Sequence, residues 1–170
     1  MENASQYDTP SLLLKLIEQE PGIRYRELLR QTGLVNGVLS YHLAALEKSG
    51  VIRSDRHSRM TRYYHVNVSE KESSVVGYVR HDPIRQILSF MLQNDMCTFN
   101  EIVEHTTKAP STVSSHLKKL REANLISIRY GEYQLYSLVD KELVAEVLSK
   151  YRQSFVDKVV DNYVEMLDDL

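Results

Sequence analysis

The sequence has one cysteine, no tryptophan and no long hydrophobic run. Because Cys97 is alone, an intramolecular disulfide and a cysteine-based zinc site are excluded. No stretch of about 18 apolar residues occurs, so no membrane-spanning helix is expected. Residues 1–6 lack the basic start and the apolar core of a secretory signal peptide. We therefore expect a cytoplasmic protein.

Signs of catalysis are also missing from the sequence. We find no paired carboxylates, nucleophile triad, glycine-rich phosphate loop or cluster of metal ligands. The composition, with 42% hydrophobic and 26% charged residues, is that of a globular protein. At 170 residues the chain has room for two small domains of about 70–90 residues each. We expect a protein that is not an enzyme and needs no cofactor.

One stretch of the sequence occurs twice, at residues 38–52 and again 74 positions later. In the first copy, Leu39, Leu43 and Leu46 recur at the spacing that places them on one face of a helix. Gly50 follows where such a helix would end in a left-handed residue. Its counterpart is Asn124, the other residue type that tolerates this conformation. Two copies predict one small domain used twice, rather than a solenoid.

The same order of elements surrounds each copy: helix, short strand, helix, turn, helix and hairpin. Thr9 and Asp82, each followed by proline, are predicted to cap the first helix of each copy. The first hairpin is predicted to turn at residues 57–61. The second is predicted to turn at residues 130–132, with a tip two residues shorter that aligns Tyr64 with Tyr136. Residues 67–80 between the copies are predicted to be a polar connection, interrupted by several valines.

The repeated motif, Ser40 to Ile52 and again Ser111 to Ile126, resembles the recognition-helix signature of ArsR/MarR-type winged-helix regulators. The resemblance covers about residues 9–66 and 82–138. The tandem arrangement is similar to that of two-domain winged-helix regulators found widely in archaea. Metal sensors of the ArsR type usually carry a cysteine pair on the recognition helix, and this chain has none there. The resemblance therefore implies a DNA-binding regulator without a metal.

The fold class implied is mainly α with small β-hairpins (α+β). It consists of two tandem winged helix-turn-helix domains plus a long C-terminal helix. The expected divisions are a first winged-helix domain at 1–68, a linker at 69–80, a second winged-helix domain at 81–139 and a dimerisation helix at 140–170.

A helix enters the major groove of double-stranded DNA when its outward residues are small or form hydrogen bonds. Both predicted recognition helices meet this condition, and the first hairpin, or wing, adds four arginines that suit phosphates or a minor groove. The expected DNA-binding residues are Asn36, Gly37, Ser40, Tyr41, Lys48, Arg53, Arg56, Arg59, Arg62, Ser111, Thr112, Ser115, Lys118 and Lys119.

Charge is distributed unevenly along the chain. Residues 24–62 carry eight Lys or Arg against three acidic residues, which gives a net charge of +5. Residues 81–170 carry ten basic against fourteen acidic residues, which gives −4. A local basic region in a chain of net charge −2 indicates one face for a polyanion and another for a different partner. We therefore expect the first copy to be the main DNA contact.

The predicted C-terminal helix begins after Asp140 and carries an apolar stripe wider than one domain can cover. Such a stripe is a liability in a monomer, and pairing about a two-fold axis would remove it. We expect a homodimer that binds an inverted-repeat operator. The alternative is that this helix folds back on its own chain. The expected interface residues are Leu148, Tyr151, Phe155, Val159, Tyr163 and Leu167.

Two functions remain open from the sequence. The first is a sequence-specific transcriptional regulator that binds double-stranded DNA. The second is a winged-helix module that binds proteins in a transcription complex or another multi-subunit complex. The arginines of the first wing favour nucleic acid. The sequence does not identify a small-molecule effector, the operator or the direction of regulation.

Overall fold

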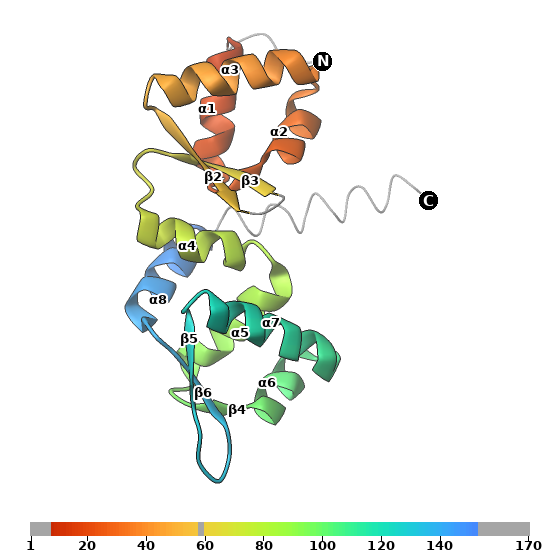
Figure 1. Ribbon diagram of the computed structural model, residues 1–170, viewed down its shortest axis with the longest axis vertical. Coiled ribbons are helices and arrows are strands. Elements are labelled where there is room, and N and C mark those ends of the chain that lie inside the picture. Colours follow the sequence, from red (N-terminus) through yellow and green to blue (C-terminus); the bar gives the residue numbers. More distant parts are fainter. Residues whose placement is uncertain (1–7, 58–59, 153–170) are drawn as a thin grey trace. The chain divides into compact units, whose positions relative to one another are not determined.

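The computed structural model describes residues 8–57 and 60–152 (Figure 1). The chain divides into two compact units, and the division falls after Ser73. Each unit repeats the predicted order of helix, short strand, two helices and hairpin. The predicted α+β class with two tandem winged helix-turn-helix domains is therefore confirmed.

The first unit contains three helices and a small sheet among its described residues. They are α1 (Thr9–Gln19), β1 (Ile23–Arg24), α2 (Tyr25–Thr32), α3 (Asn36–Lys48), β2 (Ile52–His57) and β3 (Met60–His65). The antiparallel sheet has the order β1-β3-β2. Apolar residues at helical spacing, among them Leu13, Ile17 and Leu39, meet in one fully buried core.

The second unit repeats this plan with α5 (Asp82–Gln93), β4 (Cys97–Thr98), α6 (Phe99–Thr106), α7 (Pro110–Glu122), β5 (Ile126–Arg129) and β6 (Leu135–Leu138). Its sheet has the matching order β4-β6-β5. The core lies between the helices and this sheet, and Leu88, Ile102 and Leu120 are fully buried in it. Helices α3 and α7 both contain 13 residues and start 74 positions apart, as the repeat predicted.

Left-handed residues end corresponding segments of the two units. Gly50 (φ 75°) and Asn124 (φ 57°) both follow a recognition helix, which confirms the prediction for this pair. Gly33 (φ 65°) and Thr107 (φ 53°) form a second pair, each at the end of the preceding helix. A threonine is β-branched and rarely adopts this conformation, so the second unit carries backbone strain that glycine avoids in the first.

The helix caps lie one residue earlier than predicted. Asp8, not Thr9, caps α1, and its carboxylate accepts a hydrogen bond from the Ser11 amide at 3.3 Å. His81, not Asp82, precedes α5. The proline therefore lies in the first turn of both helices, where its missing N–H costs nothing.

The predicted alignment of the two wings was wrong by one residue. Tyr63 pairs with Ile23, and Tyr136 pairs with Cys97, which lies 74 positions after Ile23. Tyr136 therefore corresponds to Tyr63 at a spacing of 73, so the second hairpin is one residue shorter rather than two. Its pairing also ends earlier, because β5 and β6 share four pairs whereas β2 and β3 share six.

The stretch expected to be a polar connection contains a helix, α4 (Glu70–Val79). The Glu72 carboxylate accepts from the Ser69 amide at 2.8 Å, and the Glu72 amide donates to the Ser69 hydroxyl at 3.2 Å. This reciprocal pair is a capping box, which the spacing of serine and glutamate would have predicted. Val75, Val76 and Val79 lie at helical spacing and are fully buried.

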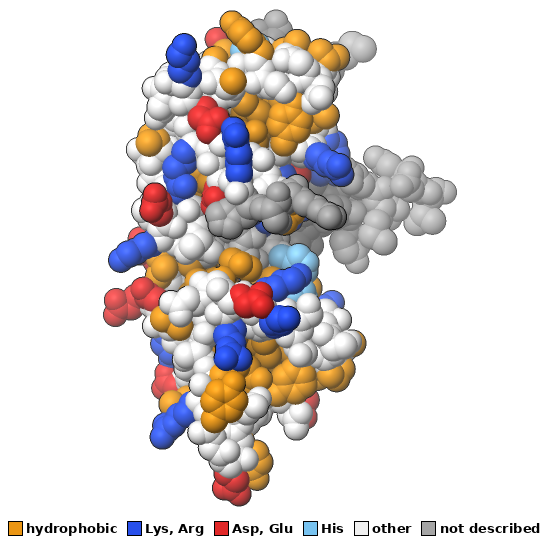
Figure 2. Space-filling model, viewed as in Figure 1, with side chains coloured by type: hydrophobic (Ala, Val, Ile, Leu, Met, Phe, Trp, Pro, Cys, Tyr) orange, Lys and Arg blue, Asp and Glu red, His pale blue; other side chains and the backbone are white. Residues whose placement is uncertain are grey.

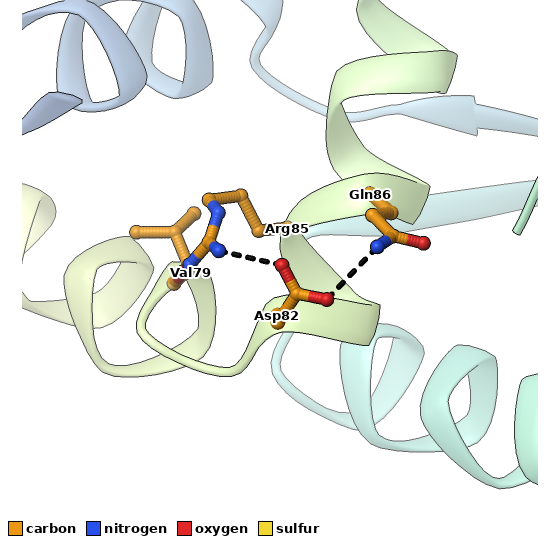
Figure 3. Close-up of polar contacts among 4 residues, drawn as sticks. All are labelled: Val79, Asp82, Arg85 and Gln86. Atoms are coloured by element: carbon orange, nitrogen blue, oxygen red, sulfur yellow. Dashed lines mark hydrogen bonds and ion pairs between the residues drawn. The ribbon is translucent and has the colours of Figure 1, made fainter. Parts of the chain in front are cut away.

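Arg85 fixes the corner between α4 and α5 (Figure 3). Its guanidinium donates to the Val79 carbonyl at 2.9 Å and to the Asp82 carboxylate at 2.6 Å. Gln86 donates to the other Asp82 oxygen at 2.8 Å. Arg85 thus satisfies a carbonyl at the end of one helix from the first turn of the next.

The last described helix is α8 (Lys141–Lys150). Asp140 caps it as predicted, since its carboxylate accepts from the Leu143 amide at 2.9 Å. Val144 and Val147 are buried, and α8 contacts α5 of the same unit. None of the helices in the described part of the chain is long and apolar enough to span a membrane. The rest of the predicted C-terminal helix, residues 153–170, lies outside the described residues.

Candidate nucleic-acid interface

Helix α3 buries one face and presents the other to solvent. Leu39 and Leu43 are buried in the core of the first unit. All five residues predicted from this helix are exposed: Asn36, Gly37, Ser40, Tyr41 and Lys48. Val35, which precedes the helix, is 70% exposed, and Tyr41 is 71% exposed. The exposed face therefore combines small, hydroxyl-bearing and apolar side chains.

Sequence reasoning missed a contact that fixes the start of this face. Tyr25, the first residue of α2, packs its ring against the core of the first unit. Its hydroxyl lies 2.9 Å from the Asn36 carbonyl oxygen and 2.8 Å from the Ser40 hydroxyl, and it also bonds to the Asn36 side-chain amide. A comparison of the two copies could have indicated this contact, because the residue that matches Tyr25 in the second copy is Phe99, which has no hydroxyl.

The outward face of α7 is more basic. Ser111, Ser115, Lys118 and Lys119 are exposed as predicted, and Thr112 is half-buried. Lys118 and Glu122 form an ion pair at 4.0 Å between exposed side chains, which contributes little to stability. Figure 2 shows Lys and Arg side chains gathered over this helix. Such a surface suits phosphates better than base edges.

The four arginines of the first wing are not equivalent. Arg53 donates to the Val68 carbonyl at 3.0 Å and lies 5.0 Å from the centre of the Tyr64 ring. Arg62 donates to the Gly22 carbonyl at 3.0 Å. Arg56 lies 3.7 Å from Glu47, but its side chain is 74% exposed. Arg59 lies outside the described residues.

Two of these arginines therefore contribute to the fold of the first unit. Arg53 connects β2 to the chain just before α4, and Arg62 connects β3 to the turn before β1. Arg56 remains accessible, since an exposed ion pair of this kind is worth about 0–1 kcal/mol and exchanges readily.

The second wing has a different surface. Arg129 and Glu132 are both exposed, so charges of opposite sign lie on one short hairpin. Tyr130 and Tyr133 are exposed large side chains on the same loop. The second wing therefore presents less net positive charge than the first wing.

A histidine and a cysteine are buried in the second unit. His116 of α7 lies 5.1 Å, ring centre to ring centre, from His81, and its Nδ1 has no hydrogen-bond partner among the described residues. Burial lowers the pKa of His116 below its ordinary value of 6.5, and nearby His81 and Lys119 lower it further. Burial likewise raises the pKa of the Cys97 thiol to about 11. Cys97 thus fills the core as a neutral thiol.

The described residues contain no metal site and only part of the predicted dimer interface. Within residues 8–57 and 60–152, no three or more His, Cys, Asp or Glu side chains come together in a way that could hold a metal ion. Of the predicted dimer residues, Leu148 is half-buried and Tyr151 is buried in the structure of one chain. Phe155, Val159, Tyr163 and Leu167 lie outside the described residues.

Two family models match the two halves of the chain. Residues 8–76 match a model described as an N-terminal HTH domain. Residues 82–127 match the model described as bacterial regulatory protein, arsR family. The second match covers α5 through the start of β5, so it includes α7 and its basic face.

A curated relative carries the same type of domain. An uncharacterized HTH-type transcriptional regulator from Methanocaldococcus jannaschii is 24% identical over 119 residues, which are 70% of this chain. The chain spans only 30% of the length of that relative.

Among solved structures, HlyU from Vibrio cholerae N16961 is similar, with a TM-score of 0.43 and 24% identity over 49% of this chain and 90% of HlyU. The reduced form of the same protein gives a TM-score of 0.42, covering 49% of this chain and 87% of HlyU.

The family matches fall on the two units that the structure shows. Each match contains a helix-turn-helix followed by the start of a wing or the whole wing. The chain therefore contains two tandem winged helix-turn-helix domains, and each of them matches a helix-turn-helix family model.

Proposed function

We propose that this chain is a transcriptional regulator that binds double-stranded DNA in a sequence-specific manner. The observation that carries this proposal is the exposed face of α3, where Asn36, Gly37 and Ser40 are followed by Lys48 about two to three turns later. Small side chains at the start of a helix let its backbone approach the base edges, and a lysine further along reaches a phosphate. In this proposal the chain is neither an enzyme nor bound to a cofactor, and it acts in the cytoplasm.

The two recognition helices have different tasks in this proposal. Helix α3 reads bases, because its exposed residues are short, hydroxyl-bearing or apolar. Helix α7 mainly contacts the phosphate backbone through Lys118 and Lys119, aided by Ser111, Thr112 and Ser115. The first unit is therefore the main source of sequence specificity.

The first wing contributes phosphate contacts through Arg56 and Arg59. Arg53 and Arg62 already bond to backbone carbonyls of the first unit. A guanidinium has five N–H donors, so these two side chains add a phosphate contact only with the donors that face outward. We expect their removal to reduce stability more than DNA affinity.

We also propose a homodimer that presents two α3 helices to an inverted-repeat operator. Its support is the apolar stripe of the sequence from Leu148 to Leu167. Val144 and Val147 of α8 are covered within one chain, so a dimer would use the later residues of this stripe.

Selection of bound duplexes from a random pool tests the proposal. The full chain is expected to enrich one sequence with two-fold symmetry. Its affinity should fall steeply with salt, because each phosphate contact releases a counterion. Enrichment of no sequence, or an affinity independent of salt, would contradict the proposal.

A second candidate function is a protein-interaction module. The exposed pair Tyr130 and Tyr133 beside Glu132 on the second wing favours it, because aromatic residues are enriched in protein interfaces. If the chain fails to bind duplex DNA at low salt, this second function is favoured.

A further inference from the structure

We propose that Tyr25 is a positioning residue that sets the base preference of α3. It holds the Asn36 amide and the Ser40 hydroxyl toward α2, and so opposes the turn of the Asn36 amide that pairing with adenine through two hydrogen bonds requires. The inference rests on the proposed function, because it concerns how the same helix reads DNA.

Tyr25 is held in place by the packing of its ring, while its hydroxyl extends toward α3. The Tyr25 ring packs against the buried cluster of the first unit, so its position is set by the core. Its hydroxyl reaches the first turn of α3, where it meets the Asn36 carbonyl oxygen at 2.9 Å, the Asn36 side-chain amide, and the Ser40 hydroxyl at 2.8 Å. These partners are 11 and 15 residues away in sequence, so they are a tertiary contact between α2 and α3.

The number of hydrogens restricts what each partner can still do. A tyrosine hydroxyl has one hydrogen to donate and lone pairs that accept. It gives that hydrogen to an Asn36 oxygen, and the Ser40 hydroxyl donates its own hydrogen to the phenol oxygen. Ser40 then presents only lone pairs to a ligand, and the Asn36 amide is held in the orientation that faces Tyr25.

The contact with Tyr25 disfavours one way of reading DNA. Asparagine recognises adenine by using its amide oxygen and nitrogen together on the N6 and N7 positions of the base. The Asn36 amide keeps a free lone pair and free hydrogens, but its bond to Tyr25 holds it toward α2. Pairing with adenine through two bonds requires this amide to turn its oxygen–nitrogen edge to the base, and Tyr25 opposes that turn.

The surroundings of Asn36 indicate what replaces that contact. Val35, Val38 and Tyr41 are exposed by 70%, 39% and 71%. Apolar side chains of this kind contact the methyl group of thymine in the major groove. The α3 face thus reads by apolar contact and single hydrogen bonds. The second unit lacks this device, because Phe99 replaces Tyr25 and Pro110 replaces Asn36.

Selection from a random duplex pool tests the inference with the full chain and four variants. These are Tyr25→Phe, Asn36→Ala, the double variant of both, and Tyr41→Phe as a control that removes a hydroxyl from α3 itself. The enriched sequences are then measured individually, at one salt concentration, with each of the four bases at the affected position. Thermal melting followed by circular dichroism checks that each variant is folded.

Tyr25→Phe is expected to gain a preference of roughly tenfold for adenine at one position per half-site, the size of a good two-bond contact. This gain should be absent in the double variant, because it acts through Asn36, and absent in Tyr41→Phe. A merely structural role for Tyr25 would lower the affinity for all sequences alike and would leave the base preference unchanged.

Three outcomes overturn the inference. The first is an unchanged base preference in folded Tyr25→Phe, and the second is an adenine gain that persists without Asn36. The third concerns the chain that keeps the Tyr25 hydroxyl. If Asn36→Ala alone removes a roughly tenfold adenine preference, Asn36 already makes two bonds to adenine in the presence of Tyr25. If the wild-type chain enriches no sequence at all, the proposed function itself fails, which is a distinct result.

Discussion

Helices α3 and α7 have the same length and the same place in their units, yet their exposed faces differ in chemistry. Both end at a left-handed residue, and both bury a leucine at matching positions, Leu43 in α3 and Leu117 in α7. Outward, α3 shows Tyr41 where α7 shows Ser115. Buried and turn positions thus preserve the domain, while exposed positions are free to acquire separate tasks.

The wings extend this contrast. The first wing has six paired positions and exposes Arg56, whereas the second has four and exposes two tyrosines beside Glu132. The two wings therefore differ both in the length of their pairing and in the charge that they expose. The difference between the units is therefore testable at each of these surfaces.

Residues 153–170 carry most of the predicted dimer residues, so removing them tests the largest expected effect. A variant ending at Arg152 keeps α8, whose valines are buried in the second unit. If the dimer forms through residues 153–170, we expect this variant to sediment as a monomer. We also expect it to bind an inverted repeat at least about 100-fold more weakly, because two linked contacts become one. Equal sedimentation of both chains would contradict the dimer.

Matched changes in the recognition helices test their division of tasks. Lys48→Glu with Tyr41→Ala should weaken binding to the selected operator by about 100-fold, the cost of two lost contacts. Lys118→Glu with Ser115→Ala should weaken it less, by about tenfold, and should weaken random duplex equally. The ratio of specific to non-specific affinity is the measurement. If the second pair of changes reduced that ratio more, the second unit would be the reader.

The first wing is tested through salt dependence. Arg56→Ala with Arg59→Ala should lower the slope of log affinity against log salt by up to about two, one for each lost phosphate contact. Arg53→Ala is the comparison, since its guanidinium bonds to backbone and should change the melting temperature instead. A slope that stays the same in the double variant would remove this wing from the interface.

The left-handed pair Gly33 and Thr107 allows a reciprocal test of stability. Thr107→Gly should raise the free energy of unfolding of the second unit by about 0.5–1 kcal/mol, because it relieves a strained β-branched residue. Gly33→Thr should lower that of the first unit by about 1–2 kcal/mol. Urea denaturation measures both changes. Thr107→Gly would be destabilising if the threonine side chain contributed more than its strain costs.

The smallest expected effect concerns His116 and pH. Its pKa is lower in the folded chain than the ordinary 6.5 of the unfolded chain, so the unfolded chain binds protons more readily. Stability is fully present above about pH 6.5 and is lost as pH falls through the folded pKa. Denaturation of the wild type and of His116→Gln between pH 5 and pH 8 should show a smaller acid loss in the variant. An identical pH dependence would exclude His116 as its cause.

The sequence predicted what is local and repeated. The 74-residue offset identified both recognition helices, and the glycine and asparagine after them indicated the left-handed ends. The wing alignment failed because two tyrosines stand side by side at Tyr63 and Tyr64, and only the pairing with β1 selects one. The capping box at Ser69 and the buried valines of α4 were visible in the sequence but were interpreted as a connection.

The rest depended on contacts between residues distant in sequence. The backbone carbonyls that Arg53 and Arg62 bond, at Val68 and Gly22, leave no trace in the residue types. Four arginines on one hairpin therefore looked equivalent until their partners were known. The Tyr25 contact likewise joins two helices through a hydroxyl. Only its replacement by phenylalanine in the second copy hinted at a special role.

Because Cys97 is buried, the rate at which its thiol is chemically labelled measures how often the core of the second unit opens. A reagent that needs a thiolate reaches this sulfur only when the core around β4 becomes accessible, because the folded thiol is buried and its pKa is raised to about 11. No other cysteine exists in the chain, so the whole signal comes from one unit. The ratio of the labelling rate in native buffer to that in denaturant gives the free energy of opening there. The stability of the second domain is thus measurable within the intact protein, separately from that of the first.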